Sequence, residues 1–388
     1  MRIVFDATAL GSGMGGDETY LAGVLEGLAI VAPPGDEFPL FIRPGAVLPP
    51  TVTDNPVFPI RMLVKRPGVW HYAASLPRAL AGERAPVDAV HCITHAPVGS
   101  SAPVALTVGD LSFRHHPEFY PPFARARLNA LVPRQARRAA AVLAPSEFTR
   151  GDLIDAYGLD PDRVFVVTNR VTRPAEATPS EREQAASLLR ERGVRDPYFL
   201  YLGNLHPRKN VPRLIEAFVA ATCRSGSAAG CQMVIAGNRW WGRNAEERAA
   251  SAAPPGSVVM LGRVGEAVRM HLLEHALALT YPSLFEGFGL PPIEAMALGT
   301  PVLASDRAAQ PEVCGDAALL VDPTDVEAIA EGLNRLAGDS ALRGDLRERG
   351  LRQAARFSTE VTGKRALVAL EAAASLRRSA GTTRGGRT

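Results

Sequence analysis

The order of elements within residues 276–304 constrains the fold of this chain more than any other feature. Uncharged apolar runs predict buried strands at 276–281 and at 300–304. Between them lie a glycine-containing loop and a short apolar-periodic segment. That segment begins with two prolines, which suit the first turn of a helix, and ends before Gly299. This strand–loop–helix–strand order predicts a parallel sheet.

The loop of this unit should lie at the carboxyl end of a strand, where open α/β sheets bind ligands. Gly287 and Gly289 let the backbone approach a ligand closely, and the N–H groups at the helix start favour an anion. Glu286 and Glu294 add two carboxylates, which accept hydrogen bonds from sugar or ribose hydroxyls. A single glutamate would more simply cap a turn or complement the helix dipole. The pair, with glycines between, favours a ligand that carries both hydroxyls and phosphate.

Apolar runs and amphipathic patterns alternate along the rest of the chain, which predicts α/β domains with doubly wound parallel sheets. The expected strands are 2–8, 40–43, 60–64, 87–93, 104–113, 141–145, 164–168, 198–203, 232–237, 258–263 and 318–321. The expected helices are 17–30, 122–140, 146–157, 181–193, 211–221, 266–277, 324–336, 340–357 and 361–376.

A length of 388 residues predicts two domains. Residues 169–180 lack apolar periodicity and contain two prolines, as expected of an interdomain linker. We expect an amino-terminal domain over 1–172 and a second domain over 173–360. A last helix over 361–378 could return to the first domain, and residues 379–388 should form a disordered tail.

Arg208 and Lys209 follow the expected strand 198–203 and come directly before a helix. Arginine can clamp a phosphate with two hydrogen bonds, and lysine adds a point charge. Two adjacent surface cations are usually just solvated. Here they should share a sheet edge with the paired glutamates, which favours phosphate binding.

The amino-terminal half offers weaker signals. The segment Gly11–Gly16 is a glycine-rich turn after the first strand, with Asp17 as the expected N-cap of the next helix. Such a turn can approach a phosphate, but a flexible connection is equally typical. Four side chains in later loops could converge at the edge of this sheet: His95, Asp110, His115 and His116. Their spacing lacks a helical i,i+4 pair, so it does not favour a metal site.

Composition excludes several classes of protein. A net charge of +3 does not indicate nucleic-acid binding. The four cysteines (Cys92, Cys223, Cys231 and Cys314) have no CxxC spacing, so they are typical of buried thiols in a reducing compartment. The sequence shows no signal peptide and no apolar run of the ~20 residues that a bilayer span needs, so we expect a cytoplasmic protein.

Two further segments leave alternatives open. The arginine-rich amphipathic helix expected over 122–140 could make a weak contact with an anionic membrane surface, although a solvated face is the more common arrangement. Trp240 and Trp241 could stack on a base or sugar, or simply pack. Nothing in the sequence indicates the oligomeric state.

The segment from Glu286 to Glu294 (Glu-Gly-Phe-Gly-Leu-Pro-Pro-Ile-Glu) resembles the E-x7-E donor motif of retaining GT-B glycosyltransferases of family GT4, also called group 1. The similarity covers nearly the whole chain and is strongest over 198–322, while 104–120 resembles bacterial mannosyl- and rhamnosyltransferase-like members. It implies two Rossmann-like domains facing a cleft. It also implies a nucleoside-diphosphate-sugar substrate with no cofactor and no metal.

The resemblance implies a role for individual residues. Glu286 would contact the donor sugar and Glu294 the nucleotide ribose, while Arg208 and Lys209 would hold the diphosphate. Asp110 would join them as a catalytic residue. Further donor contacts are implied for Gly15, Gly16, Gly203, Asn204, Arg263, Gly287, Phe288, Gly289 and Leu290.

The sequence departs from the family pattern at two places. The family usually has a His-Asp pair near the reacting sugar, where this chain has Gly109-Asp110. Either His95, His115 or His116 covers that role, as an acceptor or sugar contact, or the donor site is altered. The family's Pro-Asn-Gly-Val segment is Thr168-Asn-Arg-Val171 here.

Together these features predict a metal-independent retaining enzyme that moves a hexose-type sugar to a hydroxyl or amine of a polysaccharide intermediate or natural product. The acceptor, the donor nucleotide and the sugar are not encoded in any motif. Two alternatives are a nucleotide-sugar-binding protein without transferase activity and a nucleotide-sugar epimerase on the same fold. For the enzyme, we expect Arg208→Ala and Lys209→Ala to lower turnover strongly with little change in fold.

Overall fold

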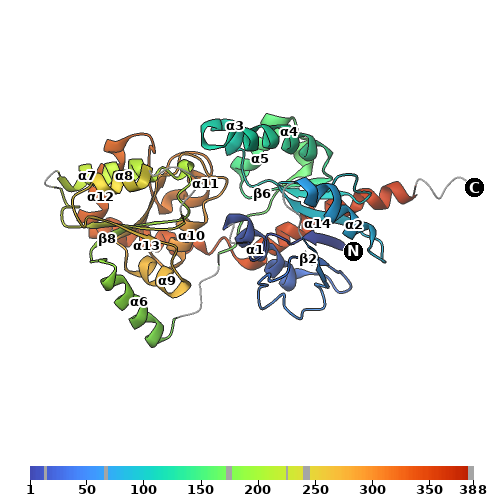
Figure 1. Ribbon diagram of the computed structural model, residues 1–388, viewed down its shortest axis with the longest axis horizontal. Coiled ribbons are helices and arrows are strands. Elements are labelled where there is room, and N and C mark those ends of the chain that lie inside the picture. Colours follow the sequence, from blue (N-terminus) through green and yellow to red (C-terminus); the bar gives the residue numbers. More distant parts are fainter. Residues whose placement is uncertain (13–14, 65–68, 172–176, 224–225, 239–244, 383–388) are drawn as a thin grey trace, which may run out of the picture. The chain divides into compact units, whose positions relative to one another are not determined.

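The computed structural model describes residues 1–12, 15–64, 69–171, 177–223, 226–238 and 245–382. Contacts between residues divide the chain into two compact units. One unit comprises Met1–Arg170 together with Phe357–Thr388, and the other comprises Val171–Arg356. Each unit has its own parallel sheet (Figure 1).

The first unit contains a seven-stranded sheet in the order β3-β2-β1-β4-β5-β6-β7, and every neighbouring pair is parallel. Its strands are β1 (Ile3–Asp6), β2 (Leu40–Ile42), β3 (Ile60–Met62), β4 (Ala89–Ile93), β5 (Val104–Thr107), β6 (Ala141–Ala144) and β7 (Val164–Val166). The strand expected over 104–113 is therefore too long. β5 ends at Thr107, and the Asp110 carboxylate accepts a hydrogen bond from the Ser112 amide at 2.8 Å at the start of a short helix.

The helices of this unit are α1 (Gly16–Val31), α2 (Leu76–Ala81), α3 (Ser112–His115), α4 (Pro122–Arg138), α5 (Glu147–Tyr157) and α14 (Thr359–Thr382). A π-helical turn, His71–Ser75, leads directly into α2. Sequence periodicity missed this segment. Ser146 caps α5 as predicted, since its hydroxyl accepts from the Thr149 amide at 3.1 Å. The prediction that Asp17 caps α1 was wrong: Gly15 is the N-cap, and Asp17 lies in the first turn, where its charge still complements the helix dipole.

The carboxyl-terminal helix α14 packs against α1 and against the sheet of the first unit (Figure 1). The two helices meet at Gly27 and Gly363. A Cβ atom added to Gly27 would lie 2.5 Å from the Gly363 Cα, so only glycine permits this approach. The helix extends to Thr382, which is within the segment expected to be a tail, and residues 383–388 lie outside the described residues.

The second unit contains a six-stranded parallel sheet in the order β10-β9-β8-β11-β12-β13. Its strands are β8 (Tyr198–Leu202), β9 (Gln232–Ala236), β10 (Val258–Gly262), β11 (Ala278–Tyr281), β12 (Val302–Ser305) and β13 (Leu319–Val321). Its helices are α6 (Pro179–Glu191), α7 (Val211–Cys223), α8 (Ala245–Ala252), α9 (Glu266–His275), α10 (Leu290–Ala297), α11 (Gln310–Cys314), α12 (Val326–Gly338) and α13 (Ser340–Ala354). Helix α7 packs against α8 and α12 (Figure 1).

The strand order reverses at β8. From this strand the chain proceeds to β9 on one side, and it later returns to β11 on the other side. Such a topological switch point leaves a crevice beyond the carboxyl ends of the two central strands, where open α/β sheets bind ligands. The loops that follow β8 and β11 carry Arg208, Lys209 and Glu286.

Candidate functional site

The loop after β8 presents Arg208 and Lys209 on a single 3-10 turn, Pro207–Lys209. His206 starts this turn because its Nδ1 accepts a hydrogen bond from the Arg208 amide at 3.2 Å. Asn210 ends it in the left-handed conformation, with φ of 62°. The Asn210 side chain donates to the carbonyls of Pro282, at 3.0 Å, and Pro323, which ties the turn to the loops after β11 and β13.

Lys209 and Arg208 both bind the carboxylate of Glu286. Lys209 Nζ lies 2.5 Å from Glu286 Oε1 and 2.5 Å from the Tyr281 hydroxyl. Arg208 Nη1 lies 3.0 Å from Glu286 Oε2 and donates to the Phe285 carbonyl at 3.2 Å. The structure thus brings together the three residues that the sequence placed on two separate loops.

The Glu286 carboxylate and the Lys209 ammonium are buried. Glu286 is 4% exposed and Lys209 is 7% exposed. Burial by itself raises the pKa of the Glu286 carboxyl, but the charges of Arg208 and Lys209 outweigh that effect and hold the pKa below its ordinary value. The carboxylate is therefore ionised, and it binds two cations at the carboxyl end of a strand.

The loop from Glu286 to Gly289 is fixed by backbone contacts. The Ala309 amide donates to the Glu286 carbonyl at 3.2 Å, and Gln310 Nε2 donates to the Phe288 carbonyl at 3.0 Å. Gly289 has φ of 93°, and a Cβ atom there would lie 1.9 Å from Gln310 Nε2. Helix α10 begins at Leu290 with prolines in its first turn, as predicted.

The second glutamate of the motif has a different environment. Glu294 on α10 accepts from Arg269 Nη1 at 2.8 Å, and Arg269 also donates to Glu266 at 2.9 and 2.6 Å. Burial lowers the pKa of Arg269, but the hydrogen bonds and charges of Glu266 and Glu294 outweigh it and raise the pKa above its ordinary value. Arg269 therefore stays charged and fixes the direction of the Glu294 carboxylate.

The structure places the polar candidates of the first unit in separate contacts. Asp110 Oδ1 holds the Ser112 amide, and the Ser112 hydroxyl lies 2.6 Å from the Tyr120 hydroxyl. His115 Nε2 lies 2.7 Å from Asp152, and His116 Nδ1 lies 3.1 Å from Glu118.

His95 lies against the Tyr72 ring, with the ring centroids 5.3 Å apart, and burial lowers its pKa. The convergence of the three histidines with Asp110 at the sheet edge stays a prediction. His115 and His116 each lie beside a different carboxylate, Asp152 for His115 and Glu118 for His116. Within the described ranges, no three His, Cys, Asp or Glu side chains gather as a metal site would require.

The remaining predicted residues occupy the expected loops. Gly203 and Asn204 directly follow β8, and Arg263 is exposed directly after β10. Gly15 precedes α1 with φ of 62°, in the first unit. Trp240 and Trp241 lie outside the described residues.

Three residues of the site escaped the sequence analysis: Tyr281, Arg269 and Gln310. Tyr281 is the last residue of β11, and its position at the carboxyl end of a strand was a usable signal. The Glu266-x-x-Arg269 spacing was another, because residues three apart are neighbours on a helix. Gln310 contacts the loop only through the folded arrangement, so no sequence signal identifies it.

Helix α4 has a basic and partly apolar surface. Arg125, Arg134 and Arg138 are exposed, and Phe123 in its first turn is 78% exposed. In the part of the chain that the structure describes, no helix is sufficiently long and apolar to cross a bilayer.

Two units that each contain a parallel α/β sheet are the architecture of GT-B proteins. The crystal structure of Anabaena Alr3699/HepE in complex with UDP-glucose shares this fold, with a TM-score of 0.72 and 16% sequence identity over 96% of this chain and 99% of that chain. Residues 22–172 match the family described as Glycosyltransferase Family 4, and residues 189–353 match Glycosyl transferases group 1. The chain belongs to this family, the GT4 group 1 glycosyltransferases with the GT-B fold.

Two bacterial relatives are similar over part of their length. The O-antigen chain mannosyltransferase B of Escherichia coli is 30% identical over 256 residues, 66% of this chain and 66% of that protein. The O-antigen chain mannosyltransferase RfbU of Salmonella typhimurium is 26% identical over 234 residues, 60% of this chain and 61% of that protein. The chain thus spans just under two thirds of the length of each relative.

Proposed function

We propose that this protein is a retaining glycosyltransferase that moves a hexose, with mannose as the first candidate, from a nucleoside diphosphate to an acceptor hydroxyl. The observation that carries the proposal is the Glu286 carboxylate bound by both Lys209 and Arg208 at the switch point of the second sheet. Mannose is the first candidate because two of the relatives are named mannosyltransferases.

The cluster suits a diphosphate that leaves with growing negative charge. Lys209 and Arg208 would stabilise that charge, together with the amides of 287–290 at the start of α10. A single preorganised hydrogen-bond donor of this kind commonly stabilises the transition state by about 2.7–4 kcal/mol. The glycine turn at Gly15 and Gly16, and the β8 loop at Gly203 and Asn204, would add backbone contacts to the phosphates.

The two glutamates would have different tasks. Glu286 is ionised but held by two cations, so its oxygens are poor nucleophiles and good acceptors for sugar hydroxyls. We assign it the orientation of the donor sugar, with the acceptor attacking from the leaving-group side. Glu294, which Arg269 holds at 2.8 Å, would accept hydrogen bonds from the ribose hydroxyls. Asp110, and one of His95, His115 and His116, would serve the acceptor side of the reaction.

Calorimetry with UDP-, GDP-, ADP- and TDP-sugars, including GDP-mannose, tests donor binding without knowledge of the acceptor. We expect one nucleotide class to bind, and Lys209→Met to abolish that binding. Product release in an assay with that donor and a panel of sugar acceptors then separates a transferase from a protein that only binds. Absence of binding by every donor would refute the proposal, and binding without transfer or donor hydrolysis would reduce it to a nucleotide-sugar-binding protein.

A further inference from the structure

A cavity of about 640 Å³ lies in the second unit between α7 and α8. Its wall is apolar along most of its length, with Pro212, Ile215 and Val219 of α7 opposite Ala249 and Ala252 of α8. Its volume is within the ~300–1,000 Å³ range of sites that bury a small molecule. Arg208, Lys209, Glu286 and Glu294 are not among the residues that line it.

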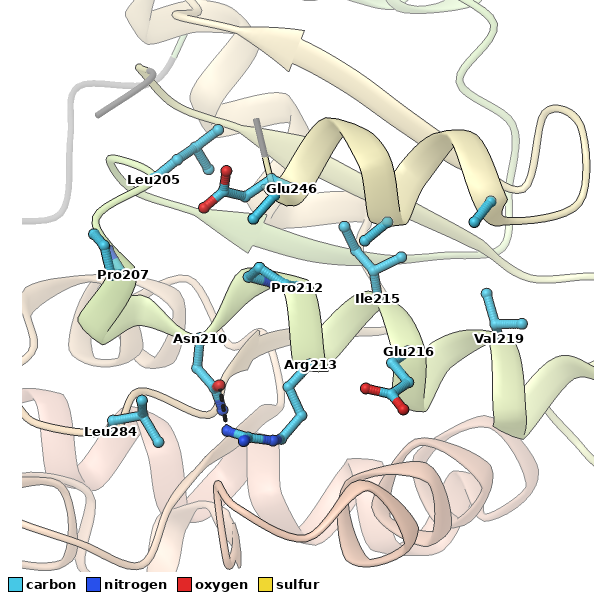
Figure 2. A pocket seen from close by; sticks show the side chains of 13 residues that line it. Leu205, Pro207, Asn210, Pro212, Arg213, Ile215, Glu216, Val219, Glu246 and Leu284 are labelled. Atoms are coloured by element: carbon cyan, nitrogen blue, oxygen red, sulfur yellow. Dashed lines mark hydrogen bonds between the residues drawn. The ribbon is translucent and has the colours of Figure 1, made fainter. Parts of the chain in front are cut away.

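A buried carboxylate lies at one end of this cavity. Glu246 is in the first turn of α8 and is 7% exposed, and Figure 2 shows its carboxylate near Leu205. Burial, together with the charge of Glu247, raises the pKa of Glu246 despite the favourable contact with its own helix N-terminus. Among the residues that the structure describes, the hydrogen bond that lowers its pKa comes from its own backbone amide. A ligand cation at this end of the cavity would pair with the carboxylate in a place that is largely shielded from water.

The other two charged residues of the described lining, Arg213 and Glu216, carry opposite charges. Arg213 Nη1 donates to Asn210 Oδ1 at 2.7 Å and lies 3.4 Å from the Pro323 carbonyl, so its guanidinium is held at the start of α7 (Figure 2). Glu216, one turn along α7, is exposed at the wall. The described lining therefore carries two carboxylates and one arginine, a net charge of −1.

We propose that this cavity is a second binding site, for a small organic cation with an apolar body whose ammonium group pairs with Glu246. The apolar residues of α7 and α8 would cover the body of the ligand, and the acidic end would select its charge. The site adjoins the donor loops without overlapping their side chains: Pro207 and Leu284, both on its wall, lie next to Arg208 and Phe285 in the chain. The Leu284 amide also donates to the Arg208 carbonyl at 2.7 Å.

Methyl NMR of the full chain tests the site with phenethylammonium and its uncharged analogue phenethyl alcohol at mildly alkaline pH. We expect the ammonium to shift the methyl signals of Leu205, Ile215 and Val219 in a saturable way. The signal of Ile293, which is buried in α10 away from the cavity wall, should not move. The dissociation constant of the ammonium should be at least about tenfold lower than that of the alcohol, as expected for one charged hydrogen bond.

The variant Glu246→Gln keeps the size of the side chain and removes its charge. It should erase the preference for the ammonium, whereas Glu247→Gln, which is next in α8 and outside the cavity wall, should retain it. Equal affinity for the two probes, an unchanged preference in Glu246→Gln, or no saturable shift of the three methyl signals would overturn the proposal. None of these results depends on the donor assay, so the inference and the proposed function can fail separately.

Discussion

Lys209 and Glu286 form a buried ion pair, with Nζ 2.5 Å from Oε1, although 77 residues separate them in the chain. They meet because β8 and β11 are adjacent parallel strands whose following loops share one sheet edge. The same pair supplies a cation for the proposed diphosphate site and satisfies a carboxylate in the protein interior. Its effects on activity and on stability are therefore linked.

Removal of the lysine should reduce both properties. Lys209→Met leaves the ionised Glu286 with one cation fewer in a buried site, which should cost about 3–5 kcal/mol of unfolding free energy. Turnover should fall about 10²–10³-fold, as is typical when an enzyme loses one preorganised hydrogen-bond donor. Arg208→Ala should reduce turnover similarly with less effect on stability, because the Arg208 side chain is 20% exposed. Denaturant titration and steady-state kinetics measure the two effects.

A double variant separates the two roles of the pair. Lys209→Met combined with Glu286→Gln removes both charges, so most of the lost stability should return while turnover stays low. The sequence predicted little change in fold for Arg208→Ala and for Lys209→Ala. The burial of Lys209 changes that expectation for the lysine. Normal turnover in the double variant would show that the pair is purely structural.

Nucleotide binding should depend on Arg269 as well as on Glu294. Arg269→Leu frees the Glu294 carboxylate to rotate, so we expect a nucleoside diphosphate to bind about tenfold more weakly, an effect typical of losing the residue that orients a ligand-binding group. Glu266→Gln is the matched control, because it removes the other partner of Arg269 and keeps the contact with Glu294. Calorimetry with the free nucleoside diphosphate measures the change. Unaltered affinity in Arg269→Leu would argue against a ribose role for Glu294.

The stability of the first unit should depend on pH through His91. This side chain is fully buried, its Nε2 lies 2.9 Å from the Thr107 hydroxyl, and burial lowers its pKa from 6.5 to about 4. The unfolded chain therefore binds a proton that the folded chain does not. The free energy of unfolding is therefore highest above pH 6.5. It falls as the pH decreases toward 4, by about 3 kcal/mol in total.

Denaturant titrations between neutral and acid pH measure this slope. His91→Gln should flatten it, since glutamine has no charge to acquire. A slope in the same pH range that survives the substitution would assign the effect to another group.

The sequence predicted the parallel sheets and the loops that carry Arg208, Lys209 and Glu286 because both depend on local patterns. Buried parallel strands appear as short apolar runs, and the segment from Glu286 to Glu294 carries its turn and helix signals within nine residues. The helices α2 and α8 escaped because they are short, and their apolar residues do not form a clear helical period. Which side chains contact one another in the site depends on which strands are neighbours, so the contact of Gln310 with the 286–289 loop could be found only in the fold.

The packing of α14 on α1 should be sensitive to a single methyl group. Gly27→Ala would place its Cβ 2.5 Å from the backbone of Gly363, and backbone atoms cannot rotate away. We expect a loss of about 1–3 kcal/mol or more in unfolding free energy. Gly151→Ala in α5 is the control: no atom lies within 4 Å of the added methyl, and alanine favours a helix by about 1 kcal/mol. In thermal unfolding, we expect Gly27→Ala to lower the melting temperature and Gly151→Ala to raise it. Equal changes in the two variants would show that the close approach of α1 and α14 is not rigid.

The missing histidine of the family pattern can be restored without steric conflict. Gly109 is exposed, no atom lies within 4 Å of a Cβ added there, and its φ is not in the left-handed region. Gly109→Ala should therefore raise the unfolding free energy by about 0.4–1 kcal/mol, chiefly by restricting the unfolded chain. Gly109→His should fold equally well, so its kinetics report on the reaction alone. If the proposed donor site has the family arrangement, Gly109→His should change turnover with the preferred donor, while Gly109→Ala should not. Equal turnover in the two variants would indicate that position 109 does not reach the reacting sugar in this protein.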